Sequence, residues 1–528
     1  MKSRNFILAI TIAVLSVLIV PTVHSAQDDA AKGKKARHHH YKLIDMGTFG
    51  GPNSNPAQDF SLNQRGVMVG WSATPNPTTP TSNPIVCGGV DGSVPFITVS
   101  FQWQDGILTD LGALPGGSNC SEPFQLNDRG EIVGTSENGL VDPVTGVDET
   151  RAVRWEDGEI EDLGSFGGTQ NAAQGINSHG QVSGWSLNTI PDPSPLNPFG
   201  ATQTRAFLWQ KGQMQDLGTL GGPDAAGFGI NEHGQIAGYS YTSSIPNPVT
   251  GRPPIDPFLW QKGKGMQDLG TLGGAYGFPN RLNNRGQVVG FSSLAASPGA
   301  CFIEFDPNCH VFLWDSGKLT DLTTSTIGGS PITPDGFNDA REIVGAADFS
   351  SSGGSPFDAY LWVNGVATDL GALGGDCFSR AIAINSHAQV VGNSFSCDFN
   401  FDHAFIWENG SIIDLNTLIP ADSSLQLAGG SDVNDRGEIA GIGVPSGVPP
   451  ANLFTEGHAF LLIPCDENHP GIEGCDYDMV DGSDMPATQM ATTAKPVLSP
   501  DSIRQLMQSA GRRSKPWYRG FGAQTQPK

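Results

Sequence analysis

The chain has 528 residues, of which 53 are acidic and 29 basic, and its formal net charge is −24. A surface this acidic repels nucleic acid, so the composition argues against a nucleic-acid-binding protein. The eight cysteines form no CxxC pair and no Cys/His cluster at zinc spacing, which favours disulfides in an exported protein over metal ligands.

The N-terminal segment has the order of features that is typical of a secretory signal peptide. Lys2 and Arg4 precede an apolar run from Phe6 to Val20, and small residues follow around Ser25. The run is too short to favour a permanent membrane span, and no later segment supplies a long apolar one. We therefore predict a signal peptide over residues 1–25 and a mature protein that is extracellular or periplasmic.

Residues 26–40 are rich in lysine and arginine and predict a flexible, basic linker. The linker ends in the triplet His38-His39-His40. A short His-rich tract could bind a metal ion. Its place in a basic segment favours a solvated stretch without a metal instead.

Residues 41–464 contain three short signatures that recur in a fixed order. An apolar strand ends at Trp103, Trp155, Trp209, Trp260, Trp314, Trp362 and Trp407, with Leu462 in an eighth version. Asp-Leu-Gly or a relative begins at Asp45, Asp110, Asp162, Asp216, Asp268, Asp321, Asp369 and Asp414. An Asn is followed seven residues later by Gly at Asn63, Asn127, Asn177, Asn231, Asn283, Asn338, Asn385 and Asn434.

The constant spacings predict two hairpins in each repeat. Tryptophan and the following aspartate are seven residues apart in six cases and eight in one. The second hairpin has an Asn-x-x-Gly turn, in which the Asn side chain can accept a bond from the backbone two residues on and Gly supplies a positive φ. Arg341 and Ala388 replace the turn glycine in two copies. Each should cost about 1 kcal/mol if the left-handed backbone is kept.

Four strands in each of eight units predict an all-β, eight-bladed propeller of four-stranded antiparallel blades. The ends of the repetitive region support this prediction. Residues 41–47 form a second hairpin strand without its partner, and residues 458–464 are that missing partner. Pairing of the N-terminal and C-terminal strands would close the ring. The alternative is an open β-solenoid, which would need a cap at both ends.

The chain direction of two successive hairpins separates the two ends of the strands. Both tight turns lie at one end, which we call the turn face. The long, variable connections lie at the other end, which we call the loop face. The candidate disulfide pairs, weighted by proximity in sequence, are Cys87 with Cys120, Cys301 with Cys309, Cys377 with Cys397 and Cys465 with Cys475.

The turn face yields one candidate docking surface. The position two residues after the turn Asn is Arg or His in seven of the eight repeats: Arg65, Arg129, His179, His233, Arg285, His387 and Arg436. The recurrence of Arg or His at one position of the turn suggests a rim that docks an anion or a partner. The alternative is a solvated turn position that tolerates any polar residue.

The loop face yields the candidate ligand surface. Long loops, the central opening and the aromatic residues Trp71, Trp185, Tyr239 and Phe291 are expected to converge there. These aromatic side chains could equally be buried edges of the blades.

We find no catalytic or cofactor motif in the sequence. GxSxG, HExxH and GxxxxGK[ST] are all absent, so we predict no catalytic, cofactor-binding or metal-binding residue. Residues 465–528 predict a low-complexity tail with a short helix over residues 500–511. Within this tail, Asp476, Asp478 and Asp481 weakly resemble a Ca²⁺ loop, but the Asp-Gly step is misplaced relative to DxDxDG.

The repeats resemble the HAF family of bacterial extracellular repeat proteins. The resemblance rests on His403-Ala404-Phe405, on His458-Ala459-Phe460, on "DLGTLGG" at Asp216 and Asp268, and on turns such as Ile176 to Gly184. It covers residues 41–464. It implies secretion and a repeated β architecture, and it implies no reaction, cofactor or catalytic residue.

These features favour a secreted binding or scaffold module that acts through the loop face of a propeller. We expect a monomer whose partner is an extracellular glycan, an envelope polymer or a protein. We expect no nucleic-acid partner and no stable membrane span. One alternative is a secreted glycan hydrolase or lyase with paired carboxylates at the channel mouth. The other is a cell-surface adhesion or structural protein.

Overall fold

The computed structural model describes residues 37–57, 60–84, 86–87, 95–116, 119–197, 200–295, 309–349, 357–398 and 401–481. The predicted signal peptide, the predicted helix over residues 500–511 and Cys301 lie outside the described residues. The described part is nearly all β. None of its helices is long and apolar enough to span a membrane.

The strands of the first half form four antiparallel sheets. Sheet 1 contains β3 (Ser54–Pro56), β4 (Met68–Pro77), β5 (Phe96–Gln104) and β6 (Ile107–Gly112). Sheet 2 contains β7 (Ser121–Leu126), β8 (Ile132–Val141), β9 (Asp148–Glu156) and β10 (Glu159–Asp162). Sheet 3 contains β11 (Gly167–Ile176), β12 (Val182–Pro191), β13 (Thr202–Gln210) and β14 (Gln213–Asp216). Sheet 4 contains β15 (Ala225–Ile230), β16 (Ile236–Tyr241), β17 (Ile255–Gln261) and β18 (Gly265–Asp268).

The second half repeats this arrangement. Sheet 5 contains β19 (Gly273–Leu282), β20 (Val288–Leu294), β21 (Cys309–Asp315) and β22 (Lys318–Asp321), and a single parallel bridge between Ile255 and Tyr276 joins it to sheet 4. Sheet 6 contains β23 (Ser330–Pro331), β24 (Gly336–Phe337), β25 (Ile343–Asp348), β26 (Phe357–Val363) and β27 (Val366–Gly371). Sheet 7 contains β28 (Asp376–Ile384), β29 (Val390–Ser396), β30 (Asp402–Glu408) and β31 (Ser411–Asp414). Sheet 8 contains β32 (Leu425–Val433), β33 (Ile439–Pro445), β34 (His458–Pro464) and, from the other end of the chain, β2 (Tyr41–Asp45).

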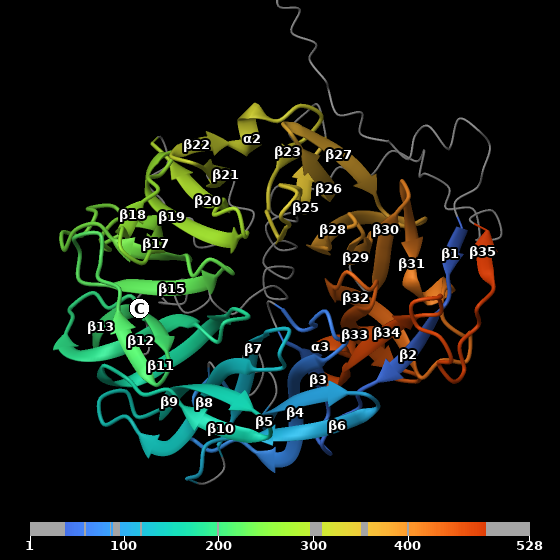
Figure 1. Cartoon of the computed structure of the whole chain (residues 1–528), viewed down its shortest axis with the longest axis horizontal. Helices are drawn as coiled ribbons and strands as arrows, with labels where there is room; N and C mark the ends of the chain where they lie inside the picture. The colour runs from blue at the N-terminus through green and yellow to red at the C-terminus, as the bar shows by residue number, and fades with distance from the viewer. Residues whose placement is uncertain are drawn as a thin grey trace, which may run out of the picture.

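A few short elements complete the fold. β1 (Arg37–His39) pairs with β35 (Met479–Asp481). The helices are α2 (Leu322–Ser325), α3 (Leu453–Glu456), η1 (Leu415–Thr417) and η2 (Pro450–Asn452). The eight sheets follow one another around a ring in chain order, so the blue N-terminal strands lie beside the red C-terminal ones (Figure 1).

The predicted pairing between the two ends of the repetitive region is present. β2 runs antiparallel to β34, with Tyr41 opposite Pro464 and Asp45 opposite Phe460. The N-terminal strand therefore supplies the outer strand of sheet 8, which the C-terminal part of the chain lacks.

The predicted Asn turns are present in all eight units. At the first turn, the Asn63 side-chain oxygen accepts a hydrogen bond from the Arg65 N–H at 3.0 Å, and Gly66 has a φ of 77°. Arg341 and Ala388 keep positive φ values of 68° and 58°. The left-handed backbone conformation is thus retained at these two positions, although a side chain disfavours it.

The turn asparagines are also joined to one another. Each Asn amide donates to the backbone carbonyl of the next turn asparagine. The series runs Asn63, Asn127, Asn177, Asn231, Asn283, Asn338, Asn385 and Asn434, and Asn434 donates to Asn63 at 2.9 Å. These hydrogen bonds, which we call the Asn circle, link sheet 8 back to sheet 1.

The glycine that ends the Asn signature has a steric cause. A Cβ on Gly70 would lie 2.2 Å from the Asn55 carbonyl oxygen and 2.6 Å from the Phe101 ring. Gly134 and Gly238 are equally restricted by the carbonyls of Glu122 and Ala226. Any larger residue there would push the inner strand away from the sheet.

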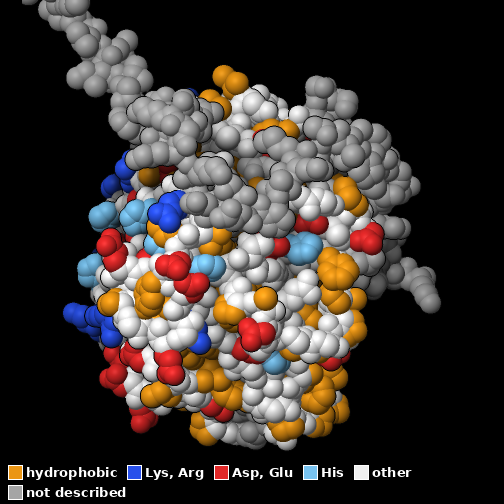
Figure 2. Space-filling view, turned by 90° about the vertical axis from the view of Figure 1, so that its right-hand side faces the viewer, with side chains coloured by type: hydrophobic (Ala, Val, Ile, Leu, Met, Phe, Trp, Pro, Cys, Tyr) orange, Lys and Arg blue, Asp and Glu red, His pale blue; other side chains and the backbone are white. Residues whose placement is uncertain are grey.

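The core consists of apolar layers between neighbouring sheets. Val69 of sheet 1 shares one buried cluster with Ile132 and Trp155 of sheet 2. Six of the seven signature tryptophans are buried in such layers, and Trp407 is partly buried; Trp155 is 1% exposed and Trp209 is 3% exposed. On the outer side visible in Figure 2, acidic, basic and hydrophobic side chains lie interspersed among the described residues.

The Asp-Leu-Gly and His-Ala-Phe signatures bind each other. The Asp45 carboxylate accepts a bond from the Gly47 N–H at 2.8 Å and contacts the His458 ring nitrogen at 2.9 Å. Arg205 takes the place of the histidine in sheet 3 and pairs with Asp216 at 2.9 Å. These signature residues therefore fasten the outer strand and its exit turn.

The described cysteines agree with the predicted pairs. Disulfides join Cys87 to Cys120, Cys377 to Cys397 and Cys465 to Cys475. Cys309 is also disulfide-bonded, and its predicted partner Cys301 lies outside the described residues. Disulfides of this number indicate an oxidising environment, extracellular or periplasmic.

Two segments predicted to be irregular contain residues that the structure places in ordered contacts. The predicted linker over residues 26–40 ends in β1, and the His38 ring is buried and hydrogen-bonded to Glu408 at 2.8 Å. The predicted low-complexity tail begins with a folded segment up to Asp481, in which the His469 ring lies 3.3 Å from Glu438. The sequence did not reveal the first contact because 370 residues separate His38 from Glu408. The second contact joins the tail to the turn of the last repeat.

Candidate functional site

A cavity of about 350 Å³ lies in the centre of the ring, where the inner strands of the sheets meet. Ligand sites in proteins usually measure about 300 to 1,000 Å³. The mouth is formed by the residues that directly follow the turn asparagines: Gln64, Glu232, Asn284, Asp339, Ser386 and Asp435. The cavity therefore opens on the turn face, whereas the sequence predicted a ligand at the loop face.

The interior is lined by side chains that break the repeat. The residue directly before each turn Asn is apolar in all eight units. The residue before that differs from one unit to the next: Ser61, Gln125, Gly175, Gly229, Arg281, Gly336, Ala383 and Asp432. Of these eight, Gln125, Gly229, Arg281 and Asp432 line the cavity. Our sequence analysis missed these positions, although irregularity within an otherwise regular repeat was the signal that could have identified them.

Gln174 is the most unusual polar residue of the lining. It comes from β11 in sheet 3 and is only 4% exposed. Neither its amide nitrogen nor its amide oxygen has a hydrogen-bond partner among the described residues. Burial of an amide without a partner costs about 1 to 3 kcal/mol, so this side chain is retained at a cost to stability.

Its neighbour Gln125 is only partly engaged. The Gln125 side-chain oxygen accepts a hydrogen bond from the Ile176 N–H at 3.2 Å. Phe228 of sheet 4 also lines this part of the cavity. Amide groups and an aromatic ring therefore adjoin one another on sheets 2 to 4.

Arg281 and Phe60 meet inside the ring. They belong to sheets 5 and 1, which lie on opposite sides of it (Figure 1). The Arg281 guanidinium lies 5.7 Å from the centre of the Phe60 ring, within the range of a cation–π contact. Arg281 also donates to the Asn280 carbonyl at 3.0 Å. We call this contact the Arg281–Phe60 crossbar.

Asp432 links sheets 8 and 1 through hydrogen bonds to backbone N–H groups of both. One carboxylate oxygen accepts bonds from the Ser61 and Leu62 N–H groups at 2.9 and 3.0 Å, and the other accepts from the Val433 N–H at 2.8 Å. Burial raises the pKa of Asp432 to about 6, against the lowering effect of these three bonds and of the Arg281 charge. The carboxylate therefore joins β32 to the start of the repetitive chain.

The three acidic residues at the mouth also join neighbouring sheets. Glu232 accepts a bond from the Ser178 N–H at 3.1 Å, Asp339 from the Asn284 N–H at 2.8 Å, and Asp435 from the Ser386 N–H at 2.8 Å. No histidine is among the residues that line this cavity. Each of the three carboxylates thus accepts a backbone hydrogen bond from the neighbouring turn.

The seven residues of the predicted docking rim are all exposed on the turn face. Several are already neutralised by neighbours. Arg129 donates to Glu131 at 2.9 Å, Arg436 lies 3.3 Å from Glu438, and His179 lies 3.6 Å from Glu232. Acids of the same or of the neighbouring turn lie beside these three residues, and the anion-docking rim stays a prediction.

The aromatic residues predicted near the loop face belong to the packing of the sheets. Trp71 is 4% exposed, Tyr239 is 8% exposed and Phe291 is 4% exposed, while Trp185 is partly buried. The alternative that they are buried edges of the blades is confirmed for the first three.

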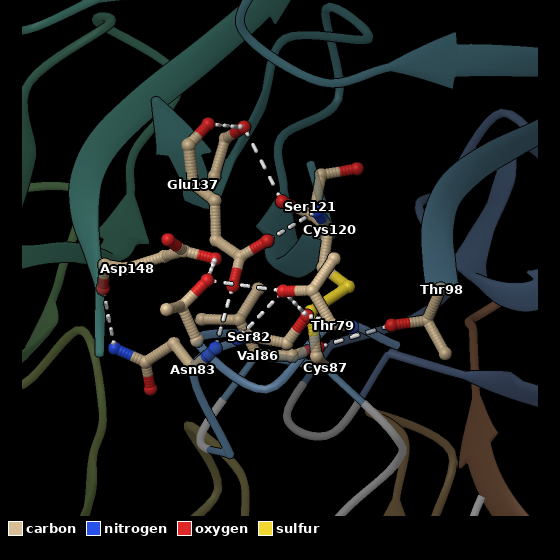
Figure 3. The surroundings of a disulfide bond; sticks show 12 residues. Thr79, Ser82, Asn83, Val86, Cys87, Thr98, Cys120, Ser121, Glu137 and Asp148 are labelled. Atoms are coloured by element: carbon tan, nitrogen blue, oxygen red, sulfur yellow. Dashed lines mark hydrogen bonds between the residues drawn. A yellow bond between two sulfur atoms is a disulfide. The ribbon is translucent and has the colours of Figure 1, made fainter. Parts of the chain in front are cut away.

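Beside the loop connections, Glu137 holds a long loop against sheet 2 (Figure 3). Its two carboxylate oxygens accept bonds from the Asn83 N–H at 2.6 Å and the Cys120 N–H at 2.8 Å. Burial raises the pKa of Glu137 to about 7, helped by the charge of Asp148. The nearby Cys87 and Cys120 sulfurs form a disulfide, so they offer no thiolate to a metal ion.

The predicted Ca²⁺ residues lie in a folded turn near the N-terminal strand. Asp476 accepts a bond from the Asp478 N–H at 3.0 Å and lies 3.7 Å from the His40 ring. Asp481 is the last residue of β35. Ca²⁺ binding at these residues stays a prediction.

Comparisons with known proteins leave the family open. No protein-family model and no curated protein matches the chain. The chain is similar at 10% identity and a TM-score of 0.38 to the acylaminoacyl peptidase of Pyrococcus horikoshii, over 74% of this chain and 58% of that one. It is similar at 10% identity and a TM-score of 0.37 to dipeptidyl peptidase 4 of Porphyromonas gingivalis, over 66% of this chain and 54% of that one. A sialidase of Trypanosoma rangeli in complex with sialic acid matches at 9% identity and a TM-score of 0.27, over 81% of this chain and 58% of that one.

The chain therefore spans little more than half the length of these three proteins. Similarities of this size support no conclusion about the activity of the chain.

Proposed function

We propose that the protein is an exported, closed eight-bladed β-propeller that serves as a binding module, and that the central cavity on the turn face binds an extracellular glycan. Closure is supported by the pairing of β2 with β34 and by the Asn circle, which returns to Asn63. Export is supported by the disulfides. Membership of the HAF family is proposed on the eight ordered copies of its signatures.

The observation that carries the binding proposal is the Gln174 amide. A side chain that is buried at a cost to stability, in a cavity and without a partner, is typical of a site that supplies hydrogen bonds to a ligand. Gln125 and Gln174 offer donors and acceptors to hydroxyl groups, and Phe228 offers an aromatic face to the apolar side of a sugar ring.

A binding screen of the mature protein tests this proposal. Soluble malto-, cello- and chito-oligosaccharides would be titrated by calorimetry, with product analysis of the same samples to detect hydrolysis. We expect binding that Gln174→Leu weakens and that Gln213→Leu leaves unchanged. Gln213 is a matched control because it is an exposed glutamine on the outer strand β14.

Two results would contradict the proposal. Equal binding by both variants would show that the ligand does not contact Gln174. Cleavage of a bound oligosaccharide would favour the glycan hydrolase alternative instead, and Glu232, Asp339 and Asp435 would then be the first carboxylates to replace.

A further inference from the structure

We infer that the cavity is a dead-end pocket, closed inside the ring by the Arg281–Phe60 crossbar, and that it takes the uncharged terminal sugar of a glycan chain end-on. This inference rests on the proposed binding function and adds to it the part of the glycan and the charge class that the site accepts.

The extent of the cavity supports a pocket with one entrance. Apart from Ala237, every lining residue lies between four residues before and one residue after a turn Asn. The inner strands continue well beyond this zone; β11, for example, begins at Gly167, ten residues before Asn177. The cavity thus occupies only the part of the ring next to the turn face.

The crossbar lies within this zone, and the lining residues Pro279 and Asn280 lie one or two positions deeper on the same strand. Phe60 is three residues before Asn63 and Arg281 is two residues before Asn283. Since the two side chains come from opposite sheets and meet at 5.7 Å, they narrow the path through the ring. A polymer cannot thread past such an obstacle, whereas its last residue can enter.

The size of the cavity agrees with one or two sugar residues. At about 350 Å³ it lies near the lower end of the range for ligand sites. Gly229 contributes to this space, because a Cβ added there would meet no atom within 4 Å. The remaining residues of a glycan would stay outside the mouth.

The charges of the lining argue against an acidic sugar. Glu232, Asp339 and Asp435 surround the mouth. Asp432 lies deeper and offsets the charge of Arg281. A uronate entering the pocket would therefore approach like charges in a partly desolvated site, which opposes binding. Neutral hydroxyl groups suit the amides of Gln64, Gln125 and Gln174 better.

The test is a length series of linear oligosaccharides on the full mature protein. Malto-, cello- and chito-oligosaccharides of one to six residues, and oligogalacturonates of the same lengths, would be titrated by calorimetry. In the neutral oligosaccharide series that binds, we expect the affinity to rise with chain length up to about two sugar residues. For longer oligosaccharides, the dissociation constant should stay within roughly twofold of that value. We expect oligogalacturonates to bind at least tenfold more weakly.

A crossbar variant provides the second measurement. In Phe60→Gly/Arg281→Gly the obstacle is removed, so affinity should continue to rise with length up to six residues. Lys318→Gly is the control, because Lys318 is an exposed cation on the outer strand β22 of the same sheet as Arg281. It should keep the plateau of the wild type.

The outcomes separate the two proposals. If no oligosaccharide binds the wild-type protein, the proposed function fails and this inference fails with it. If neutral oligosaccharides bind with affinity that rises steadily to six residues, or if oligogalacturonates bind more tightly, the binding function stands and the end-on pocket is wrong. The length series on the wild type decides this point even if the double variant does not fold.

Discussion

Replacement of Gln174 by leucine should make the protein more stable and a poorer binder at the same time. Both polar atoms of this side chain are buried without a partner, so the folded state bears a desolvation cost of about 1 to 3 kcal/mol. Leucine has a similar volume and no polar atom. We therefore expect Gln174→Leu to raise the free energy of unfolding by about 1 to 3 kcal/mol.

The expected loss of affinity follows from the same amide. One or two hydrogen bonds to a ligand contribute roughly 1.5 kcal/mol in total, which corresponds to about a tenfold change in the dissociation constant. Stability would be measured by urea denaturation without ligand, and affinity by calorimetry with the oligosaccharide that binds best. Gln213→Leu should change the free energy of unfolding by less than about 0.5 kcal/mol and leave the affinity unchanged.

Opposite signs of the two effects are the specific result that the structure predicts. A less stable Gln174→Leu would mean that the amide is satisfied in the folded protein. A more stable variant with unchanged affinity would mean that the cost of this amide is unrelated to the ligand.

Three further predictions concern stability. Asn231→Ala removes the partner of the His233 N–H, the Gln235 N–H and the Asn283 carbonyl. We expect it to lower the free energy of unfolding, measured by urea denaturation, by about 3 to 5 kcal/mol. A decrease no larger than that caused by the exposed control Asn76→Ala would contradict the role of the Asn circle. Burial raises the pKa of Glu137 to about 7 in the folded protein, whereas the pKa in the unfolded chain is about 4.5. The contribution of the protonated side chain to the free energy of unfolding is therefore fully present below about pH 4.5 and is lost as the pH rises through 7. Wild type should therefore lose up to about 3 kcal/mol relative to Glu137→Gln between pH 4.5 and 7; parallel pH profiles would contradict this. Cys87→Ser/Cys120→Ser should lower the free energy of unfolding by about 3 to 4 kcal/mol. It should also make the chain near Asn83 sensitive to protease and leave the glycan affinity unchanged. A loss of affinity would mean that this loop shapes the cavity.

The local elements of the fold were predictable from the sequence because each has a local cause. The Asn-x-x-Gly turns need one side chain and one positive φ, so their spacing alone located eight hairpins. The pairing of residues 41–47 with residues 458–464 was also predictable, because an unmatched strand at one end of the repeats requires a partner at the other.

The candidate site was not predictable in the same way. Gln125, Gln174 and Arg281 lie on three different sheets, and only the ring brings them to one cavity. The regular positions of the repeat instead predict the Arg and His rim of the turn face. The positions that carry the proposed function are those at which the repeat is irregular.

The proposed closure of the ring underlies the binding proposal, and a cross-link between the two ends of the repetitive region tests this closure most directly. Lys42 of β2 is registered opposite Ile463 of β34. All described cysteines are disulfide-bonded, so a new cysteine pair can be followed by its effect on mobility in a non-reducing gel. We predict that Lys42→Cys/Ile463→Cys forms a disulfide that speeds migration of the unfolded chain, whereas the distant pair Lys42→Cys/Gln213→Cys does not. Absence of the first cross-link in folded protein would contradict the closed ring.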